Sequence, residues 1–133
     1  EIRNCDWSSD VCSSDLSPSV EGEDVRDHIG FSLAAGDFDA DGYDDLFVGG
    51  GSSDRGVTDG GAVYGLFGPG PWDADVGLAD VVLVPTMRAN LGYRLATGDT
   101  QEDGYADLLI SATTDTSLGS SPGVAWLVVG QGI

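Results

Sequence analysis

The apolar residues of this chain fall in short runs of Val, Leu, Ile and Ala that Gly, Asp and Pro interrupt. Runs of three to six residues predict buried β-strands, whereas an amphipathic helix would need a longer stretch with a period of 3.6 residues. Continuous apolar runs of this kind are typical of strands covered on both faces. The expected strands are residues 31–35, 46–48, 62–67, 81–84, 93–97, 108–110 and 124–129. The pattern therefore predicts an all-β fold.

The chain repeats itself at an offset of 62 residues without a gap. Residues 29–37 match 91–99, and the match continues through the acidic segment after them and through the later strand at 61–64 and 123–126. Four short strands per unit, repeated radially, are typical of β-propeller blades. The expected architecture is two consecutive four-stranded antiparallel blades, the second incomplete. The predicted divisions are a linker or the end of a preceding blade at 17–28, a first blade at 29–85 and a second at 86–133.

The first sixteen residues share neither the repeat nor its hydrophobic pattern. Asp6–Leu16 resembles the translation of a short-read sequencing adapter, and the segment contains both cysteines, Cys5 and Cys12. We therefore interpret residues 1–16 as non-native and expect them to be disordered. The remaining chain then has no thiol for a disulfide or a thiolate metal site.

An acidic nonapeptide separates the first two strands of the first unit. Asp37, Asp39, Asp41 and Asp45 occupy positions 1, 3, 5 and 9 of this loop, and the carbonyl of Tyr43 is at position 7. Hard oxygen donors without His or Cys favour Ca²⁺ over zinc or copper. A solvated acidic turn is the alternative, and an EF-hand fits poorly because its twelfth position would be Val48 and strands are expected on both sides of the loop.

The second unit carries the corresponding loop with one change of ligand type. Its candidate ligands are Asp99, Gln101, Asp103, Tyr105 through its carbonyl, and Asp107. An amide at position 3 can still coordinate a cation, but it brings no charge. The first site is therefore expected to bind Ca²⁺ more tightly.

These units resemble FG-GAP repeats, the blades of integrin α-subunit-like β-propellers. The resemblance rests on the loop D-x-D-x-D-G-Y-x-D and the Leu-x-Val-Gly that follows it, over about residues 29–130. The FG position is Ile29-Gly30 and Leu91-Gly92, so it departs from the consensus. The GAP position departs as well, with Gly49-Gly50-Gly51 and Ser111-Ala112-Thr113. The resemblance implies calcium binding and adhesion or ligand binding through loops on one rim.

Charge and composition narrow the possible functions. The net charge of −18, with five Arg or Lys residues against 23 acidic ones, argues against nucleic-acid binding. No apolar run is long enough for a membrane-spanning helix. Gly119–Gly123 matches G-x-S-x-G, but a nucleophile elbow requires a strand before it and a helix after it, and here a strand is expected to follow. No catalytic residues are predicted.

The sequence favours a non-catalytic, calcium-binding FG-GAP propeller segment of a secreted or cell-surface protein. Its expected partner is a protein or carbohydrate ligand that binds the rim loops. Extracellular placement follows from loop-type calcium sites, which fill where Ca²⁺ is millimolar. The alternative is an accessory propeller domain of a secreted hydrolase or lyase whose catalytic domain lies elsewhere in the protein.

Overall fold

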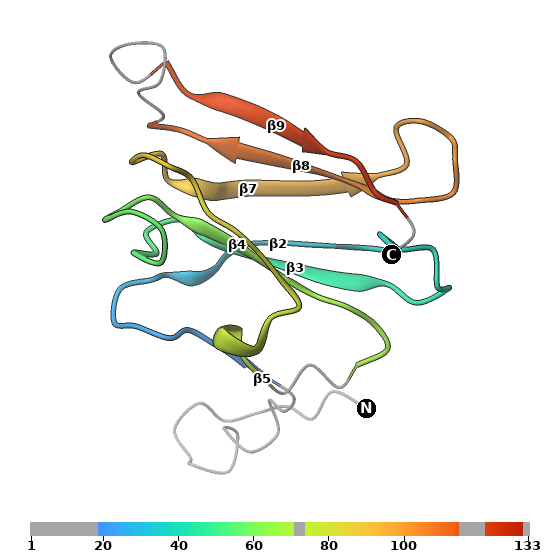
Figure 1. Ribbon diagram of the computed structural model, residues 1–133, viewed down its shortest axis with the longest axis horizontal. Helices are drawn as coiled ribbons and strands as arrows, with labels where there is room; N and C mark the ends of the chain where they lie inside the picture. Colours follow the sequence, from blue (N-terminus) through green and yellow to red (C-terminus); the bar gives the residue numbers. More distant parts are fainter. Residues whose placement is uncertain (1–18, 71–73, 115–121, 132–133) are drawn as a thin grey trace, which may run out of the picture.

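The computed structural model describes residues 19–70, 74–114 and 122–131, and it is an all-β structure (Figure 1). The first antiparallel sheet has the strand order β2 (Ile29–Gly36), β3 (Asp45–Gly50), β4 (Ala62–Leu66) and β6 (Val81–Leu83). The second has the order β7 (Leu91–Gly98), β8 (Asp107–Ala112) and β9 (Val124–Val128). Sequential strands that pair with their neighbours form the meander of a propeller blade. All seven predicted strands are confirmed, and the predicted segment 1–16 lies outside the described residues.

Two small features were not predicted. β1 (Val20–Glu21) pairs in parallel with β5 (Ala74–Asp75), and a 3-10 helix covers Val76–Leu78. Asp75 caps this helix by accepting a hydrogen bond from the Gly77 amide at 2.8 Å. Elements of two or three residues are too short to leave a periodic pattern in the sequence.

The 62-residue repeat is present in the backbone itself. Both first strands carry a register shift at the same place, between Ile29 and Ser32 in β2 and between Leu91 and Arg94 in β7. The left-handed backbone positions also recur at this offset. They are His28 and Asn90, Gly30 and Gly92, Ala40 and Glu102, Gly42 and Gly104, and Gly61 and Gly123. The two units therefore share their turns and bulges as well as their strands.

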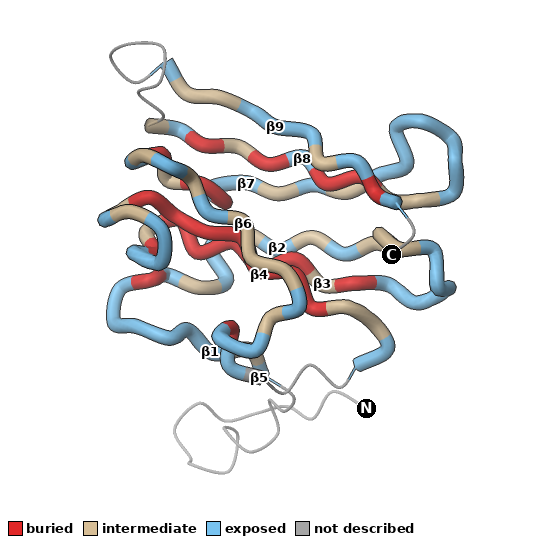
Figure 2. The backbone as a smooth tube through the Cα atoms, in the orientation of Figure 1, coloured by how far each residue is buried: buried red, intermediate tan, exposed pale blue. Residues whose placement is uncertain are grey.

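The main core lies between the two sheets (Figure 2). Phe47 and Val63 of the first sheet pack with Leu108, Ile110 and Ala112 of the second, all of them buried. Burying one Leu, Ile, Val or Phe side chain contributes about 1.5–3 kcal/mol to folding. This apolar interface is the main contact that holds the two units together.

The first strands of the two units, β2 and β7, lie side by side (Figure 1). The Ser32 hydroxyl donates to the Gly92 carbonyl at 2.5 Å, and the rings of Phe31 and Tyr93 are 5.0 Å apart. A Cβ at Gly49 would lie 2.3 Å from the carbonyl oxygen of Gly92, so only glycine permits this backbone approach. The glycine run after the acidic loop therefore has a packing role.

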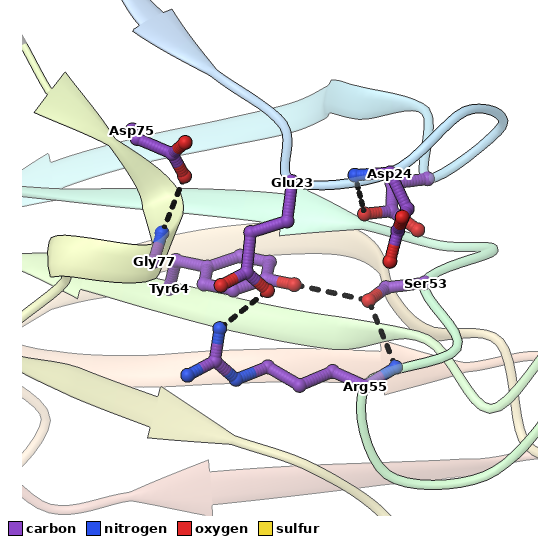
Figure 3. Close-up of polar contacts among 8 residues, drawn as sticks. Glu23, Asp24, Ser53, Arg55, Tyr64, Asp75 and Gly77 are labelled. Atoms are coloured by element: carbon purple, nitrogen blue, oxygen red, sulfur yellow. Dashed lines mark hydrogen bonds and ion pairs between the residues drawn. The ribbon is translucent and has the colours of Figure 1, made fainter.

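The two sheets differ in how their other faces are covered. On the first sheet, a second cluster of Ala62, Tyr64 and Val76 is fully buried. The Tyr64 hydroxyl lies 3.0 Å from the Ser53 hydroxyl, under an ion pair of Arg55 with Glu23 at 2.5 Å (Figure 3). On the second sheet, Leu109 and Leu127 are about half exposed. The expectation that the apolar runs are covered on both faces is therefore wrong for β8 and β9.

None of the helices among the described residues is long and apolar enough to cross a membrane.

Candidate metal centre

The two acidic loops connect the first and second strands of their sheets and lie at the same end of the molecule (Figure 1). Residues 37–44 join β2 to β3, and residues 99–106 join β7 to β8. The Ala106 amide donates to the Asp37 carbonyl at 2.8 Å, so the loops are linked to each other. Any cation bound in one loop would therefore also stabilise the position of the other.

The first loop is a series of turns that its own carboxylates organise. Asp37 Oδ2 accepts from the Gly42 amide at 3.0 Å, and Asp39 Oδ1 accepts from the Asp41 amide at 3.1 Å. Asp41 Oδ1 accepts from the Tyr43 amide at 2.8 Å. Gly42 has φ +92°, which glycine adopts without the steric cost that a side chain would cause. The alternation of Asp with other residues thus folds the loop back on itself.

Asp45 ends the loop and is completely buried at the start of β3. Its Oδ2 accepts from the Phe38 amide at 2.8 Å, and its Oδ1 accepts from the Gly68 amide at 2.9 Å. The carboxylate therefore ties the start of the loop to the segment after β4. Two amide donors partly compensate for the loss of water around this charge.

Three of the four carboxylates predicted in the first loop come together. Asp37, Asp39 and Asp45 each offer one oxygen, and these oxygens lie within 4.8 Å of one another. Asp37 Oδ1 is buried and has no hydrogen-bond partner. A buried carboxylate oxygen that lacks a donor is costly unless a cation or water satisfies it. The donor set and this oxygen fit a hard cation such as Ca²⁺.

The structure does not bring Asp41 into this group. Its carboxylate is exposed and accepts the amide of Tyr43, two residues further along the chain. The prediction that Asp41 and the Tyr43 carbonyl are ligands therefore stays a prediction. The complete ligand sets of both loops also stay predictions, because the structure shows which oxygens are available but not which of them bind a cation.

The second loop folds in the same way but uses its carboxylates differently. Asp99 Oδ2 accepts from the Gly104 amide at 2.9 Å, as its counterpart Asp37 does from Gly42. Asp99 Oδ1, however, accepts from the Asp103 amide at 3.1 Å. In the first loop the corresponding amide, that of Asp41, bonds to Asp39 instead. Where Gln101 replaces Asp39, the amide at position 5 therefore bonds to Asp99 Oδ1, whereas Asp37 Oδ1 in the first loop has no hydrogen-bond partner.

Asp107 is the buried counterpart of Asp45 and has one more donor. Its Oδ2 accepts from the Thr100 amide at 2.8 Å and from the Thr100 hydroxyl, and its Oδ1 accepts from the Gly130 amide at 3.0 Å. Among the described residues, Asp99, Asp103 and Asp107 do not form a close group of three carboxylates. Gln101 stands where Asp39 completes the group of the first loop, so the second loop has one carboxylate fewer, and its predicted ligands, with Gln101 and Tyr105, stay a prediction.

The pKa values of the two buried carboxyls move in opposite directions. Burial raises the pKa of Asp45, and the charges of Asp39 and Asp41 add to the rise, while the amides of Gly68 and Phe38 oppose it. The Thr100 hydroxyl and amide lower the pKa of Asp107. The Gly104 amide lowers the pKa of Asp99 in the same way. In the first loop, burial chiefly, and the charges of Asp39 and Asp41 in addition, therefore disfavour the ionised form of Asp45.

Sequence reasoning missed the partners of the buried carboxyls. The repeat pairs Gly68 with Gly130, 62 residues apart, but the sequence did not identify their amides or Thr100 as donors to these carboxyls. That recurrence was a usable signal, whereas nothing in the sequence identified Thr100 as a donor. Of the G-x-S-x-G match, Gly119–Ser121 lie outside the described residues, and the predicted strand after it is confirmed as β9.

Comparisons with known proteins agree with the repeat. Residues 29–66 match the FG-GAP repeat family model. The chain is also similar to integrin alpha-PS2 of Drosophila melanogaster, with 31% identity over 104 residues. That alignment covers 73% of this chain and 7% of the integrin, so the chain spans a small part of its relative. Residues 29–66 therefore match an FG-GAP repeat, and the chain is similar over 104 residues to an integrin α chain.

Proposed function

We propose that this chain is a calcium-binding segment of a cell-surface or extracellular protein and acts in adhesion or ligand binding rather than catalysis. The observation that supports this most directly is the first acidic loop. Within a segment that matches the FG-GAP repeat, three carboxylates converge and the buried Asp37 Oδ1 lacks a partner. A cation at this position would satisfy that oxygen and offset the repulsion among the carboxylates.

The first site would be held by Asp37, Asp39 and Asp45, with Asp41 and the Tyr43 carbonyl as further proposed ligands. Asp45 already connects this loop to the segment after β4 through the Gly68 amide. Bound Ca²⁺ would supply a positive charge that cross-links these carboxylates. With Asp37 at the end of β2 and Asp45 at the start of β3 holding the same ion, these two strand ends would be fixed relative to each other.

The second site would use Asp99, Gln101, Asp103, the Tyr105 carbonyl and Asp107. It has fewer carboxylates, and each carboxylate oxygen of Asp99 and Asp107 already accepts an amide or hydroxyl hydrogen bond. Calcium affinity rises with the number of charged ligands and with the rigidity of the site. We therefore assign it the weaker binding.

A rim opposite the acidic loops is the proposed place for a protein or carbohydrate ligand. β2 begins, and β3 ends, at the other end of the sheet from the loop that connects them. A groove of about 560 Å³ lies there, lined by Asp27, His28, Ser52 and Asp54 among others. Similarity to an integrin α chain favours adhesion for this rim and placement at the cell surface.

Calorimetric titration of the full chain with Ca²⁺ tests the proposed function. We expect Asp39→Asn to weaken the tighter binding phase at least about tenfold, because it removes one ligand charge but keeps an oxygen that can accept the Asp41 amide. Asp44→Asn, which removes an exposed neighbouring charge outside the ligand positions, is the matched control and should leave that phase unchanged. Absence of Ca²⁺ binding by the unmodified chain at millimolar concentration would refute the proposal.

A further inference from the structure

The backbone that leads into the first acidic loop is in direct contact with the second unit. The Ala106 amide donates to the Asp37 carbonyl at 2.8 Å, and the Thr97 hydroxyl donates to the Ala35 carbonyl. Gly36 lies between these two acceptors in the chain, and a Cβ there would be 2.9 Å from the Ala106 Cβ. The chain therefore enters the candidate metal centre while it is packed against the other unit.

The contact continues through the residue that follows Asp37. The Phe38 carbonyl oxygen is close to Gly130 of the second unit, where a Cβ would lie 2.9 Å from that oxygen and 2.3 Å from the Ala106 carbonyl oxygen. The Phe38 ring packs on Phe47 in the core between the sheets, with ring centroids 5.3 Å apart. Phe38 therefore faces the second unit with its backbone and enters the shared core with its side chain.

Asp37 belongs to this contact and to the candidate metal centre at the same time. Its backbone carbonyl accepts from Ala106, whereas its carboxylate belongs to the group with Asp39 and Asp45 and has a buried Oδ1 without a partner. Asp45 in turn accepts the Phe38 amide at 2.8 Å. Repulsion or attraction at these carboxylates therefore acts directly on the backbone that contacts the second unit.

We propose that a cation in the first loop fastens the second unit to the first, a role that rests on the calcium binding proposed above. Without an ion, the carboxylates of Asp37, Asp39 and Asp45 repel one another and the buried Asp37 oxygen lacks a partner. Both effects favour an outward movement of Asp37, which would break the hydrogen bond of its carbonyl with Ala106. With an ion bound, the same movement would also have to break the contacts between the metal and the carboxylates. The hydrogen bond between the units then opens only when the ion is released.

This linkage fixes the size of the calcium effect on the contact. If opening requires release of the ion, Ca²⁺ lowers the open population by a factor of one plus the ratio of its concentration to the dissociation constant. Concentrations of about ten to a hundred times the dissociation constant should slow hydrogen exchange of the Ala106 amide about ten- to a hundredfold. The logarithm of the exchange rate should fall against the logarithm of the Ca²⁺ concentration with a slope of about −1.

Hydrogen exchange of the full chain, followed by NMR in Ca²⁺ and in a chelator, tests the proposal. The Gly42 amide, which is bonded within the first loop, reports whether that loop has bound the ion. Asp39→Asn should move the calcium effect on the Ala106 amide to at least about tenfold higher Ca²⁺. Asp103→Asn removes a predicted ligand charge of the second loop but keeps an acceptor oxygen, and it should leave the effect intact.

Gly36→Ala and Gly98→Ala are a matched pair, because both positions immediately precede the first aspartate of an acidic loop. A methyl group at Gly36 would be 2.9 Å from the Ala106 Cβ and would push the units apart, whereas at Gly98 it would meet nothing within 4 Å. We expect Gly36→Ala still to show calcium binding at Gly42 but to lose most of the calcium-dependent protection of Ala106. Gly98→Ala should retain that protection.

Three results would overturn the proposal. The first is a calcium response at Gly42 with unchanged exchange at Ala106, which would leave the proposed calcium binding standing. The second is a calcium effect on Ala106 that Asp103→Asn removes and Asp39→Asn does not, which would assign the effect to the second loop. The third is equal protection of Ala106 in Gly36→Ala and in the parent chain, because the contact would then not transmit the effect. Absence of any response at Gly42 would refute the calcium binding itself, and this role with it.

Discussion

At the scale of single residues, the two buried carboxyls Asp45 and Asp107 have the same place in the repeat but different electrostatic surroundings. Asp45 faces the charges of Asp39 and Asp41 and has two amide donors. Asp107 has the additional hydroxyl of Thr100. Burial is the main cause of the raised pKa of Asp45, whereas the Thr100 hydroxyl is the main cause of the lowered pKa of Asp107. Position 2 of the loop, Phe38 in one unit and Thr100 in the other, therefore contributes to the difference.

The Thr100 hydroxyl should protect the fold against acid. The pKa of Asp107 in the folded chain lies below its ordinary value of 3.8, so its carboxylate stabilises the fold above that pH. This stabilisation is lost as the pH falls through the lowered pKa. Thr100→Val removes the hydroxyl, which brings the pKa back towards 3.8 and moves the acid unfolding midpoint to higher pH. Denaturant melts between about pH 2 and 7 measure the shift.

The control for this prediction is Thr113→Val, which removes an exposed hydroxyl in the same unit. It should leave the pH profile of the unfolding free energy unchanged. Identical profiles for Thr100→Val and the unmodified chain would show that the hydroxyl does not stabilise the charge of Asp107.

At the scale of elements, the bulges at the start of β2 and β7 require glycine for different reasons. Gly30 and Gly92 have nearly the same left-handed backbone, with φ of +85° and +84°. A Cβ at Gly30 would meet nothing within 4 Å. A Cβ at Gly92 would lie 2.7 Å from the Ala62 carbonyl oxygen and 3.1 Å from Gly49 Cα. Gly30 is therefore required by its backbone conformation alone, whereas Gly92 is required by its conformation and by its close packing against the first unit.

Gly92→Ala should destabilise the chain more than Gly30→Ala. Both changes place a side chain in the left-handed region, which costs about 1–2 kcal/mol. Gly92→Ala adds a clash with backbone at the contact between the units, which costs a further 1–3 kcal/mol or so. Urea unfolding of the two variants gives the difference directly. Equal losses would mean that the two units separate easily enough to accommodate the methyl group.

The elements were easier to predict from the sequence than the contacts between them. Seven strands are visible because each is a short, mostly apolar run bounded by Gly, Asp, Pro or Ser, and the period of 62 residues identifies the repeat. The pair β1–β5 has two residues in each strand and no such pattern. The exposure of Leu109 could not be predicted, because its counterpart Phe47 is buried and the local sequences are alike. Phe47 is buried because the second sheet packs on its face, whereas no described residues cover the face that carries Leu109. The packing of one sheet on another cannot be read from the local sequence.

For the candidate site too, the residue types could be predicted from the sequence, but their hydrogen bonds could not. Its residue types and spacing indicated Ca²⁺, and the structure brings together Asp37, Asp39 and Asp45. The backbone bonds that decide which oxygens are available were not visible in the sequence. They depend on turn geometry within each loop, such as the Asp41 amide bonding to Asp39 where the Asp103 amide bonds to Asp99.

At the scale of the whole molecule, calcium should act on stability chiefly through the first loop. Asp37 Oδ1 is buried and has no partner, whereas its counterpart Asp99 Oδ1 accepts the Asp103 amide. The first loop thus has an oxygen ready for a cation and more negative charge around it. At Ca²⁺ concentrations of about ten to a hundred times the dissociation constant, one occupied site adds about 1.4–2.7 kcal/mol to the unfolding free energy. Chelation should remove that amount.

Replacing Gln101 with Asp should give the second loop the properties of the first. The new carboxylate would accept the Asp103 amide, as Asp39 accepts that of Asp41, and release Asp99 Oδ1 for a cation. It also adds one ligand charge, and both changes favour Ca²⁺. Thermal melts with Ca²⁺ and with a chelator should then show a larger calcium-dependent stabilisation for Gln101→Asp than for the unmodified chain. Without Ca²⁺ the variant should be less stable, because the added charge repels Asp99 and Asp103. If Gln101→Asp gains no calcium response, the amide at position 101 is not what weakens the second site. The order of the two sites is tested in the parent chain, where we expect Asp41→Ala to remove the tighter phase, and loss of that phase with Asp103→Ala instead would show that the order is reversed.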